Sequence, residues 1–200
     1  LNSYNETLAR VKHYSKKFIV NPAVFTLKYE KNIGIYPSVG SIRVCIVTSA
    51  QPRKGYQQFL EIAKNSELKG VNYMVISQDD LDSKLKSVTH VKPRSDKEYV
   101  DALKQCHFVL STSTFEGFGL PLIEAMALGI VPIAFYNPGM DEFNTEKNIT
   151  IIDNVVDFDN KITKIADDED RYIKLSNSVI KSASVFTTQN FYFSMIDKIK

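Results

Sequence analysis

The chain has 200 residues, of which 44% are hydrophobic and 24% are charged, and its formal net charge at pH 7 is +2. This length suits one domain, or one domain with appended segments, and it allows a sizeable buried core. The composition is that of an ordinary globular protein, and the scattered lysines form no basic run with interleaved aromatic residues, so we expect no nucleic-acid partner.

The cysteines and the lack of long apolar runs bear on where the protein works. Cys45 and Cys106 have no metal-ligand spacing, and we interpret both as reduced, buried side chains. So few cysteines suit a reducing compartment. No stretch approaches the ~18 apolar residues of a membrane helix, and no signal peptide is visible. We therefore expect a cytoplasmic location, with peripheral association at the inner face of the membrane left open.

The first 40 residues differ in pattern from the rest. Residues 2–17 are polar with apolar positions at helical spacing, which predicts a short amphipathic helix. Residues 18–40 mix short apolar pieces with proline and glycine, which break regular structure. We interpret residues 1–40 as a lead-in or linker. Because the chain begins with Leu1, we expect it to be a piece of a longer protein.

From residue 41 onward, short β-branched runs alternate with helical patterns. The runs predict strands over 42–47, 71–76, 88–91, 108–110, 131–135 and 149–152. The helical patterns cover 55–64, 81–86, 95–106 and 121–128, and the tail from about 157 to 200 reads as helices broken near 167–170 and 187–188. Ser95 and Glu98 form a capping box at the start of one helix.

This alternation predicts the fold class: an α/β protein with a Rossmann-like parallel sheet and helices on both faces. We assign the Rossmann-like domain to residues 41–186 and a separate terminal helix to residues 187–200. Open parallel sheets bind ligands beyond the carboxyl ends of their strands, so the strand-to-helix turns are the places to search for a site.

The turn after the strand at 108–110 carries the strongest pattern. Residues 111–121 read STSTFEGFGLP, a hydroxyl-rich loop followed by Glu116, two glycines and a helix start. The glycines allow close backbone approach to a ligand, and the helix start presents unpaired N–H groups that favour a phosphate. Glu124 lies about one turn into the helix and can face the same cleft. A plain capped turn with Glu124 on the surface explains the local pattern equally well.

The turn after the strand at 42–47 offers cations. Residues 48–56 read TSAQPRKGY, in which Lys54 can reach the same cleft and meet phosphate charge, with Arg53 as the second candidate. Taken alone, this turn is better explained as two solvated cations beside a turn glycine. Lys54 and Arg53 are candidate phosphate-binding residues only in combination with the turn of residues 111–121.

Residues 113–132 (STFEGFGLPLIEAMALGIVP) resemble the glutamate-x7-glutamate signature of retaining GT-B glycosyltransferases, in particular glycosyltransferase family four. The resemblance extends over about residues 40–195. It implies two facing Rossmann-like domains, of which this chain is the C-terminal one that holds the nucleotide sugar. It also implies a missing N-terminal Rossmann domain, from which residues 1–40 would lead in and to which residues 187–200 would cross back.

The resemblance implies a role for each candidate residue. Glu116 would contact the transferring sugar, and Lys54 would stabilise charge on the departing diphosphate. Glu124 would accept hydrogen bonds from the ribose hydroxyls. The remaining donor-binding residues would lie near the sugar, at the diphosphate or against the base: Gly117, Phe118, Gly119, Leu120, Arg53, His90 and Val91. Thr48 stands where the family has a second phosphate-binding arginine, for which Arg53 is the substitute.

The implied reaction transfers a sugar from a nucleoside-diphosphate sugar to a glycan, lipid or protein hydroxyl, with retention and with neither a metal nor a further cofactor. The isolated domain is expected to be inactive alone. A non-catalytic partner of an active glycosyltransferase is the alternative, favoured by Thr48, and a different sugar-phosphate enzyme such as an epimerase is a third hypothesis. The sequence contains no P-loop, GxGxxG motif or nucleophile elbow.

Overall fold

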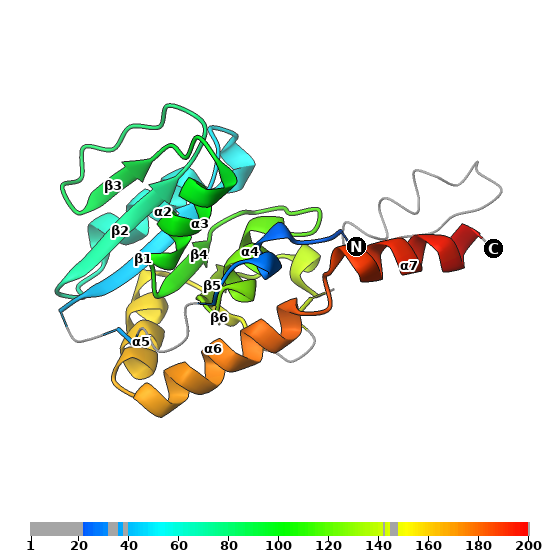
Figure 1. Cartoon of the computed structure of the whole chain (residues 1–200). Helices are drawn as coiled ribbons and strands as arrows, with labels where there is room; N and C mark the ends of the chain where they lie inside the picture. Colours follow the sequence, from blue (N-terminus) through cyan, green and yellow to red (C-terminus); the bar gives the residue numbers. More distant parts are fainter. Residues whose placement is uncertain (1–21, 32–35, 38–39, 142, 145–147, 200) are drawn as a thin grey trace.

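The computed structural model describes residues 22–31, 36–37, 40–141, 143–144 and 148–199. The predicted helix over residues 2–17 lies outside these ranges. The described residues form one six-stranded parallel sheet in the order β3-β2-β1-β4-β5-β6 (Figure 1). The strands are β1 (Ile42–Val47), β2 (Val71–Ile76), β3 (Val88–Val91), β4 (Phe108–Ser111), β5 (Val131–Phe135) and β6 (Thr150–Ile152). The predicted strands and the predicted fold class are thus confirmed.

Helices connect the strands and continue beyond the sheet. They are η1 (Phe25–Lys28), η2 (Pro52–Lys54), α2 (Tyr56–Asn65), α3 (Asp96–Lys104), α4 (Leu120–Ala127), η3 (Pro138–Met140), α5 (Val155–Ala166), α6 (Glu169–Ala183) and α7 (Thr188–Ile199). The predicted breaks in the tail are confirmed, since α5 gives way to α6 at 167–168 and α7 begins at Thr188. In Figure 1, α7 extends away from the body of the domain.

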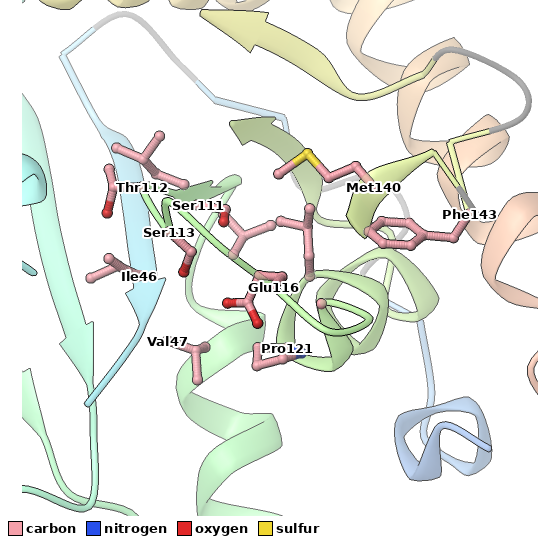
Figure 2. A pocket seen from close by; sticks show the side chains of 13 residues that line it. Ile46, Val47, Ser111, Thr112, Ser113, Glu116, Pro121, Met140 and Phe143 are labelled. Atoms are coloured by element: carbon pink, nitrogen blue, oxygen red, sulfur yellow. The ribbon is translucent and has the colours of Figure 1, made fainter. Parts of the chain in front are cut away.

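The strand order reverses between β1 and β4. From β1 the chain goes outward through β2 to β3, and then returns to place β4 on the other side of β1. Crevices for ligands form at such reversal points, beyond the carboxyl ends of the strands. Figure 2 shows this place, where Val47 at the end of β1 and Ser111 at the end of β4 line the same pocket.

Side-chain alternation along the strands divides the core into two layers. In β1, Val44 and Ile46 face a layer that contains residues of α2 and α5, whereas Cys45 faces a layer built from α3, α4 and α6. Successive strand residues point to opposite faces, so one β-branched run supplies both layers. The central strands are therefore buried on both sides, as expected for a parallel sheet.

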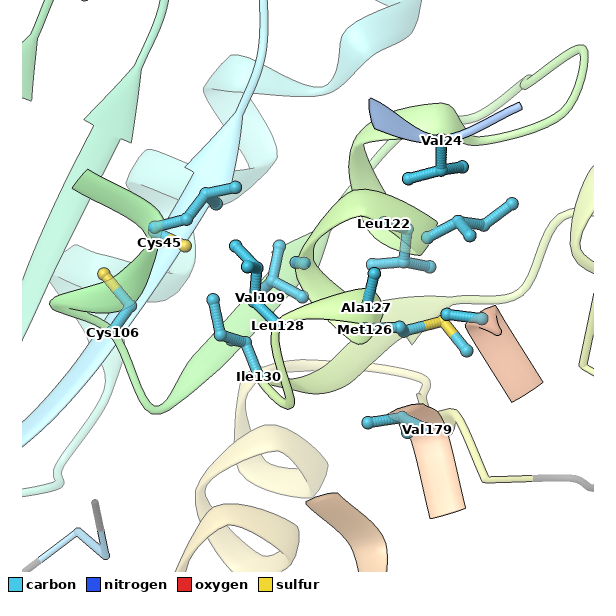
Figure 3. Packing of buried hydrophobic residues seen from close by; sticks show 14 of the residues in the cluster. Val24, Cys45, Cys106, Val109, Leu122, Met126, Ala127, Leu128, Ile130 and Val179 are labelled. Carbon is cyan, nitrogen blue, oxygen red and sulfur yellow. The ribbon is translucent and has the colours of Figure 1, made fainter. Parts of the chain in front are cut away.

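The layer on the α4 side also holds both cysteines (Figure 3). Cys45 and Cys106 are free thiols and fully buried, as predicted. The neighbouring Cys106 thiol and burial raise the pKa of the Cys45 thiol well above its ordinary value. Both side chains therefore act as small apolar residues of the core.

The helix predicted over residues 81–86 is wrong. This stretch is an irregular loop in which Leu81 and Leu85 still pack against the α2-side layer. Ser83 Oγ accepts a hydrogen bond from the Leu85 backbone N–H at 3.1 Å, which offers the backbone a turn in place of a helix. Two leucines at i and i+4 fit the helical period, but so short a segment does not repay helix nucleation.

The segment of residues 22–31 packs onto the domain, although it falls within the predicted lead-in. Val24 is buried, and its backbone N–H donates to the Phe186 carbonyl oxygen at 2.8 Å, just before α7. The fully buried Thr26 donates its hydroxyl hydrogen to the Glu124 carbonyl oxygen at 3.0 Å. We call residues 22–31 the N-terminal segment. The predicted division of the chain at residues 40 and 187 stays a prediction.

A buried histidine gives the fold a specific acid sensitivity. His107 is 2% exposed, its Nδ1 accepts the Arg43 backbone N–H at 3.0 Å, and burial, followed by the nearby Arg43 charge, lowers its pKa to about 4. The unfolded chain, with an ordinary histidine pKa of about 6.5, binds this proton more readily. The contribution of His107 to stability is therefore complete above about pH 6.5 and is lost as the pH falls toward 4.

We expect the free energy of unfolding to fall by about 2 kcal/mol between pH 7 and pH 5 on account of this group alone. Urea unfolding of the wild-type chain and of His107→Gln at both pH values measures the effect. Between the two pH values, the free energy of unfolding of His107→Gln should fall by about 2 kcal/mol less than that of wild type. The control is His90→Gln, the same change at an exposed histidine. Equal losses in wild type and His107→Gln would contradict the prediction.

Candidate functional site

Two loops meet where the strand order reverses. One loop follows β1 and contains η2, and the other follows β4 and leads into α4. Gly55 brings them together: its φ is 71°, and a Cβ atom there would lie 2.1 Å from the Thr112 carbonyl oxygen. Thr112 Oγ1 in turn donates to the Gly55 carbonyl oxygen at 2.7 Å. Only glycine permits both the backbone conformation and this approach, so Gly55 fixes Lys54 beside the second loop.

Lys54 and Glu116 form an ion pair across the two loops. Lys54 Nζ lies 2.8 Å from Glu116 Oε1 and 2.9 Å from Oε2, and the side chains are only 19% and 12% exposed. Charges this far removed from water need a partner, which each supplies to the other. The structure thus brings together two predicted site residues that are 62 positions apart in the sequence.

The connection between β5 and β6 supports Glu116 from the other side. A Cβ atom on Gly139 would lie 2.4 Å from the Glu116 carbonyl oxygen, so this loop approaches the backbone of Glu116 closely. The buried Asn137 accepts the Gly139 N–H at 3.1 Å. In Figure 2, the Glu116 carboxylate lies at a narrow pocket between the ends of β1 and β4 and the start of α4, with Met140 and Phe143 on the far wall.

Glu124 lines a separate, wider pocket on the α3 side of α4. The pocket has a volume of about 490 Å³ and is lined by Phe25, Val47, Gln78, Pro93, Arg94, Ser95, Asp96, Tyr99, Pro121 and Glu124. Tyr99 donates its hydroxyl hydrogen to Glu124 Oε2 at 2.7 Å. Burial raises the pKa of Glu124, and the Tyr99 hydrogen bond acts against this rise. A carboxylate acceptor therefore stands in the wall of a pocket of ligand size.

A third pocket adjoins the wider pocket and includes Thr48. It shares Val47, Gln78, Pro93 and Tyr99 with the wider pocket, and its volume is about 220 Å³. Thr48 is buried, and its hydroxyl donates to the Lys54 carbonyl oxygen at 3.2 Å. Thr48, which stands where the resemblance implies a cation, thus uses its side chain for a hydrogen bond within its own loop. Arg53 is exposed, with Nη1 3.5 Å from the Phe115 carbonyl oxygen, and no pocket described above includes it.

The glycine-rich turn is arranged around the start of α4. Gly119 has a φ of 76° and is the residue that precedes α4, whereas a Cβ on Gly117 would meet open space. The Phe118 ring packs against Phe143 and Phe186, with centroids 5.9 and 5.4 Å apart, so its side chain serves the core. Leu120 is 37% exposed at the first position of α4.

The structure does not bring His90 to the wider pocket. His90 is exposed on β3, and its ring lies edge-on to Tyr56 of α2 at 6.3 Å, on the opposite face of the sheet. Its neighbour Val91 packs against the α4-side layer. The alternation of side chains along β3 is the reason. Pro93 and Arg94, just after the strand, line the pocket instead.

Sequence reasoning missed Tyr99 and Phe25 as pocket residues. Tyr99 lies within the helix predicted over residues 95–106, and Phe25 lies in the predicted lead-in or linker. A tyrosine on a buried helix face carries a hydroxyl that needs a partner, which is the signal that could have identified Tyr99. For Phe25 the local pattern gives no comparable signal, because its contact with the domain joins residues distant in the sequence.

Clusters of metal ligands and membrane-spanning helices are both absent from the described residues. In those parts of the chain, no group of three or more histidine, cysteine, aspartate or glutamate residues is placed to hold a metal ion. No helix there is long and apolar enough to cross a membrane.

The fold and the site define a class: a Rossmann-like α/β domain whose pockets lie at the switch point of its sheet. The sequence matches the family described as Glycosyl transferases group 1 over residues 30–184. The chain belongs to this glycosyltransferase family. No curated protein matches it.

Solved glycosyltransferase structures share the fold. Sucrose-phosphate synthase from Thermosynechococcus elongatus matches with a TM-score of 0.72 and 18% identity, over 98% of this chain and 55% of that one. The pneumococcal O-GlcNAc transferase GtfA, solved with UDP and GlcNAc, gives 0.72 and 18%, over 98% and 43%. The C-terminal domain of LpcC from Francisella tularensis gives 0.61 and 21%, over 77% and 89%. The chain therefore spans about half the length of the two longer proteins.

Proposed function

We propose that this chain is the donor-binding domain of a retaining glycosyltransferase. In this proposal the longer protein transfers a sugar from a nucleoside-diphosphate sugar to a hydroxyl of a glycan, lipid or protein acceptor. The bond between the anomeric carbon and the diphosphate oxygen breaks, and its electron pair leaves with the diphosphate. The acceptor oxygen forms the new bond on the same face and releases its proton. The observation that carries the proposal is the Lys54–Glu116 pair, which joins the loop after β1 to the loop that leads into α4.

The pair supports the proposal because its charges suit the two parts of a nucleotide sugar. The Lys54 ammonium is a donor for the diphosphate and would stabilise negative charge that grows as the bond breaks. The Glu116 carboxylate is an acceptor for sugar hydroxyls. The N-terminus of α4, which begins at Leu120 after Gly119, adds N–H groups that favour an anion. On binding, the diphosphate would replace the carboxylate as the partner of Lys54.

The wider pocket supports a place for the nucleoside. Its volume of about 490 Å³ exceeds what a ribose and a base require, and its wall combines the Tyr99 and Phe25 rings with polar groups. The carboxylate of Glu124 is suited to accept hydrogen bonds from two adjacent ribose hydroxyls. Val47 and Pro121 line both this pocket and the narrow one beside Glu116, so the proposed nucleoside and sugar sites are adjacent.

The test is calorimetric titration of the chain with UDP, GDP, ADP, CMP and dTDP. One nucleotide should bind preferentially, and Glu124→Ala should weaken that binding by about 10- to 100-fold, since hydrogen bonds to charged groups contribute about 1.5–3 kcal/mol. The matched control is Glu61→Ala, an exposed residue of α2 outside the pockets described above, which should bind as wild type does. Binding that Glu124→Ala leaves unchanged would contradict the proposed ribose contact.

One observation favours a second function, that of a non-catalytic partner of an active glycosyltransferase. Thr48 provides no charge where the resemblance implies a phosphate-binding arginine, and its hydroxyl is used within the loop. Sugar transfer by the purified full-length protein alone would exclude this function. Transfer that appears only when a second glycosyltransferase is added would support it.

A further inference from the structure

The Glu124 residue is held at two points by two different elements. Its carboxylate accepts the Tyr99 hydroxyl of α3 at 2.7 Å, and its backbone carbonyl accepts the Thr26 hydroxyl of η1 at 3.0 Å. The two elements also contact one another, since the Phe25 and Tyr99 rings lie 5.9 Å apart. A glutamate with a free side chain would sample several rotamers, and the Tyr99 hydrogen bond restricts the Glu124 side chain to few of them, while the Thr26 hydrogen bond holds its backbone.

The Tyr99 hydroxyl is placed to orient the carboxylate. It donates to Oε2, which leaves Oε1 and the remaining lone pairs of Oε2 as acceptors toward the pocket. It also favours the ionised carboxylate, because its hydrogen bond lowers the pKa of Glu124, which burial and the nearby Asp96 charge raise. The tyrosine itself keeps its proton, since burial and the Glu124 charge raise its own pKa well above the ordinary value. Tyr99 is therefore a permanent donor to Glu124.

The position of Tyr99 is fixed by its own helix. Ser95 precedes α3 and accepts the Glu98 N–H at 3.2 Å, while Glu98 Oε2 accepts the Arg94 N–H at 2.7 Å. Tyr99 thus begins the second turn of a well-capped helix, with its ring packed against the α4-side layer. The hydroxyl has little freedom to move away from Glu124.

We infer that Tyr99 is a positioning residue for Glu124, which fixes the carboxylate so that it accepts hydrogen bonds from the ribose hydroxyls of the donor. The inference rests on the proposed function, and it assigns to α3 a part in donor binding. Tyr99 need not touch the nucleotide through its hydroxyl, because it acts through the glutamate. Removal of the Tyr99 hydroxyl should therefore weaken the binding only of ligands that carry ribose hydroxyls.

The experiment uses Tyr99→Phe, which keeps the ring and removes the hydroxyl. The ligands are the tightest-binding nucleoside diphosphate of the panel above and its 2′,3′-dideoxy analogue. The variant should bind the ribonucleotide about 10-fold more weakly. Its affinity for the dideoxy analogue should equal that of wild type. In addition, affinity of the variant for the ribonucleotide should begin to fall at a higher pH than in wild type, as Glu124 becomes easier to protonate.

The matched control is Tyr172→Phe, which removes a buried hydroxyl that donates to the His107 carbonyl oxygen at 3.1 Å, far from the pocket residues. It should leave both affinities unchanged. Equal weakening of both ligands by Tyr99→Phe would show a merely structural role and overturn the inference. Wild-type affinity of Tyr99→Phe for the ribonucleotide would overturn it as well. Failure of the wild-type chain to bind any nucleotide of the panel would overturn the proposed function and this inference with it.

Discussion

Replacing Lys54 by alanine is expected to lower kcat of the full-length enzyme by about 100- to 1,000-fold, the usual cost of removing one group that stabilises charge in a transition state. The ammonium is only 19% exposed and is paired with Glu116 in the loop that leads into α4, so few waters can take over its role. The variant also leaves the Glu116 carboxylate without its partner beside the proposed diphosphate site. We therefore expect UDP, or the nucleotide that binds, to bind more weakly too.

Arg53→Ala is the matched control for this experiment. Arg53 is the adjacent cation, but it is exposed and its Nη1 lies 3.5 Å from the Phe115 carbonyl oxygen, whereas Lys54 is 19% exposed and paired with Glu116. Its removal changes the net charge by the same amount as Lys54→Ala and should lower kcat by less than about 3-fold, in keeping with the small effects of exposed charges. If Arg53→Ala lost more activity than Lys54→Ala, the resident phosphate-binding cation would be Arg53. Steady-state kinetics of both variants decides between them.

Replacing Glu116 by glutamine should separate turnover from nucleotide binding. The loss of a charged acceptor for the sugar should lower kcat by about 10- to 100-fold. The nucleoside diphosphate has no sugar, and Glu116→Gln releases Lys54 from its ion pair and removes a negative charge near the diphosphate. The nucleotide should consequently bind as tightly as in wild type or more tightly, which calorimetry measures.

Two controls define the role of Glu116. Glu61→Gln, the same change at an exposed site on α2, should leave both kcat and nucleotide affinity unchanged. The double variant Lys54→Ala with Glu116→Gln should lose less nucleotide affinity than Lys54→Ala alone, because residues in contact act non-additively. Wild-type turnover in Glu116→Gln would show that the carboxylate does not contact the transferring sugar.

The sheet could be predicted because each central strand is a compact β-branched run. Runs such as residues 42–47 and 131–135 have the period and length of buried strands, and parallel order follows from the helices between them. The 81–86 segment failed because its two leucines meet the helical period while Ser83 supplies a competing turn. Two apolar residues spaced four positions apart do not distinguish a helix from a loop that packs against the domain.

The candidate site could be predicted as a set of loops but not as a set of contacts. Glu116, Glu124 and Lys54 follow from residue types at strand-to-helix turns. Their actual partners depend on strand order and on distances that the sequence does not contain. His90 shows the limit most clearly, since the choice of face on β3 depends on the register of a four-residue edge strand.

The Gly55–Thr112 contact and the Lys54–Glu116 pair have a consequence for folding. Residues 42–91 form one half of the sheet and residues 108–152 form the other, and the two halves are joined through the pairing of β1 with β4. Both contacts cross this seam. A ligand bound between the loops would contact both halves, and by mass action it would shift the equilibrium away from their separation. Donor binding would thus stabilise the domain across the point where the strand order reverses.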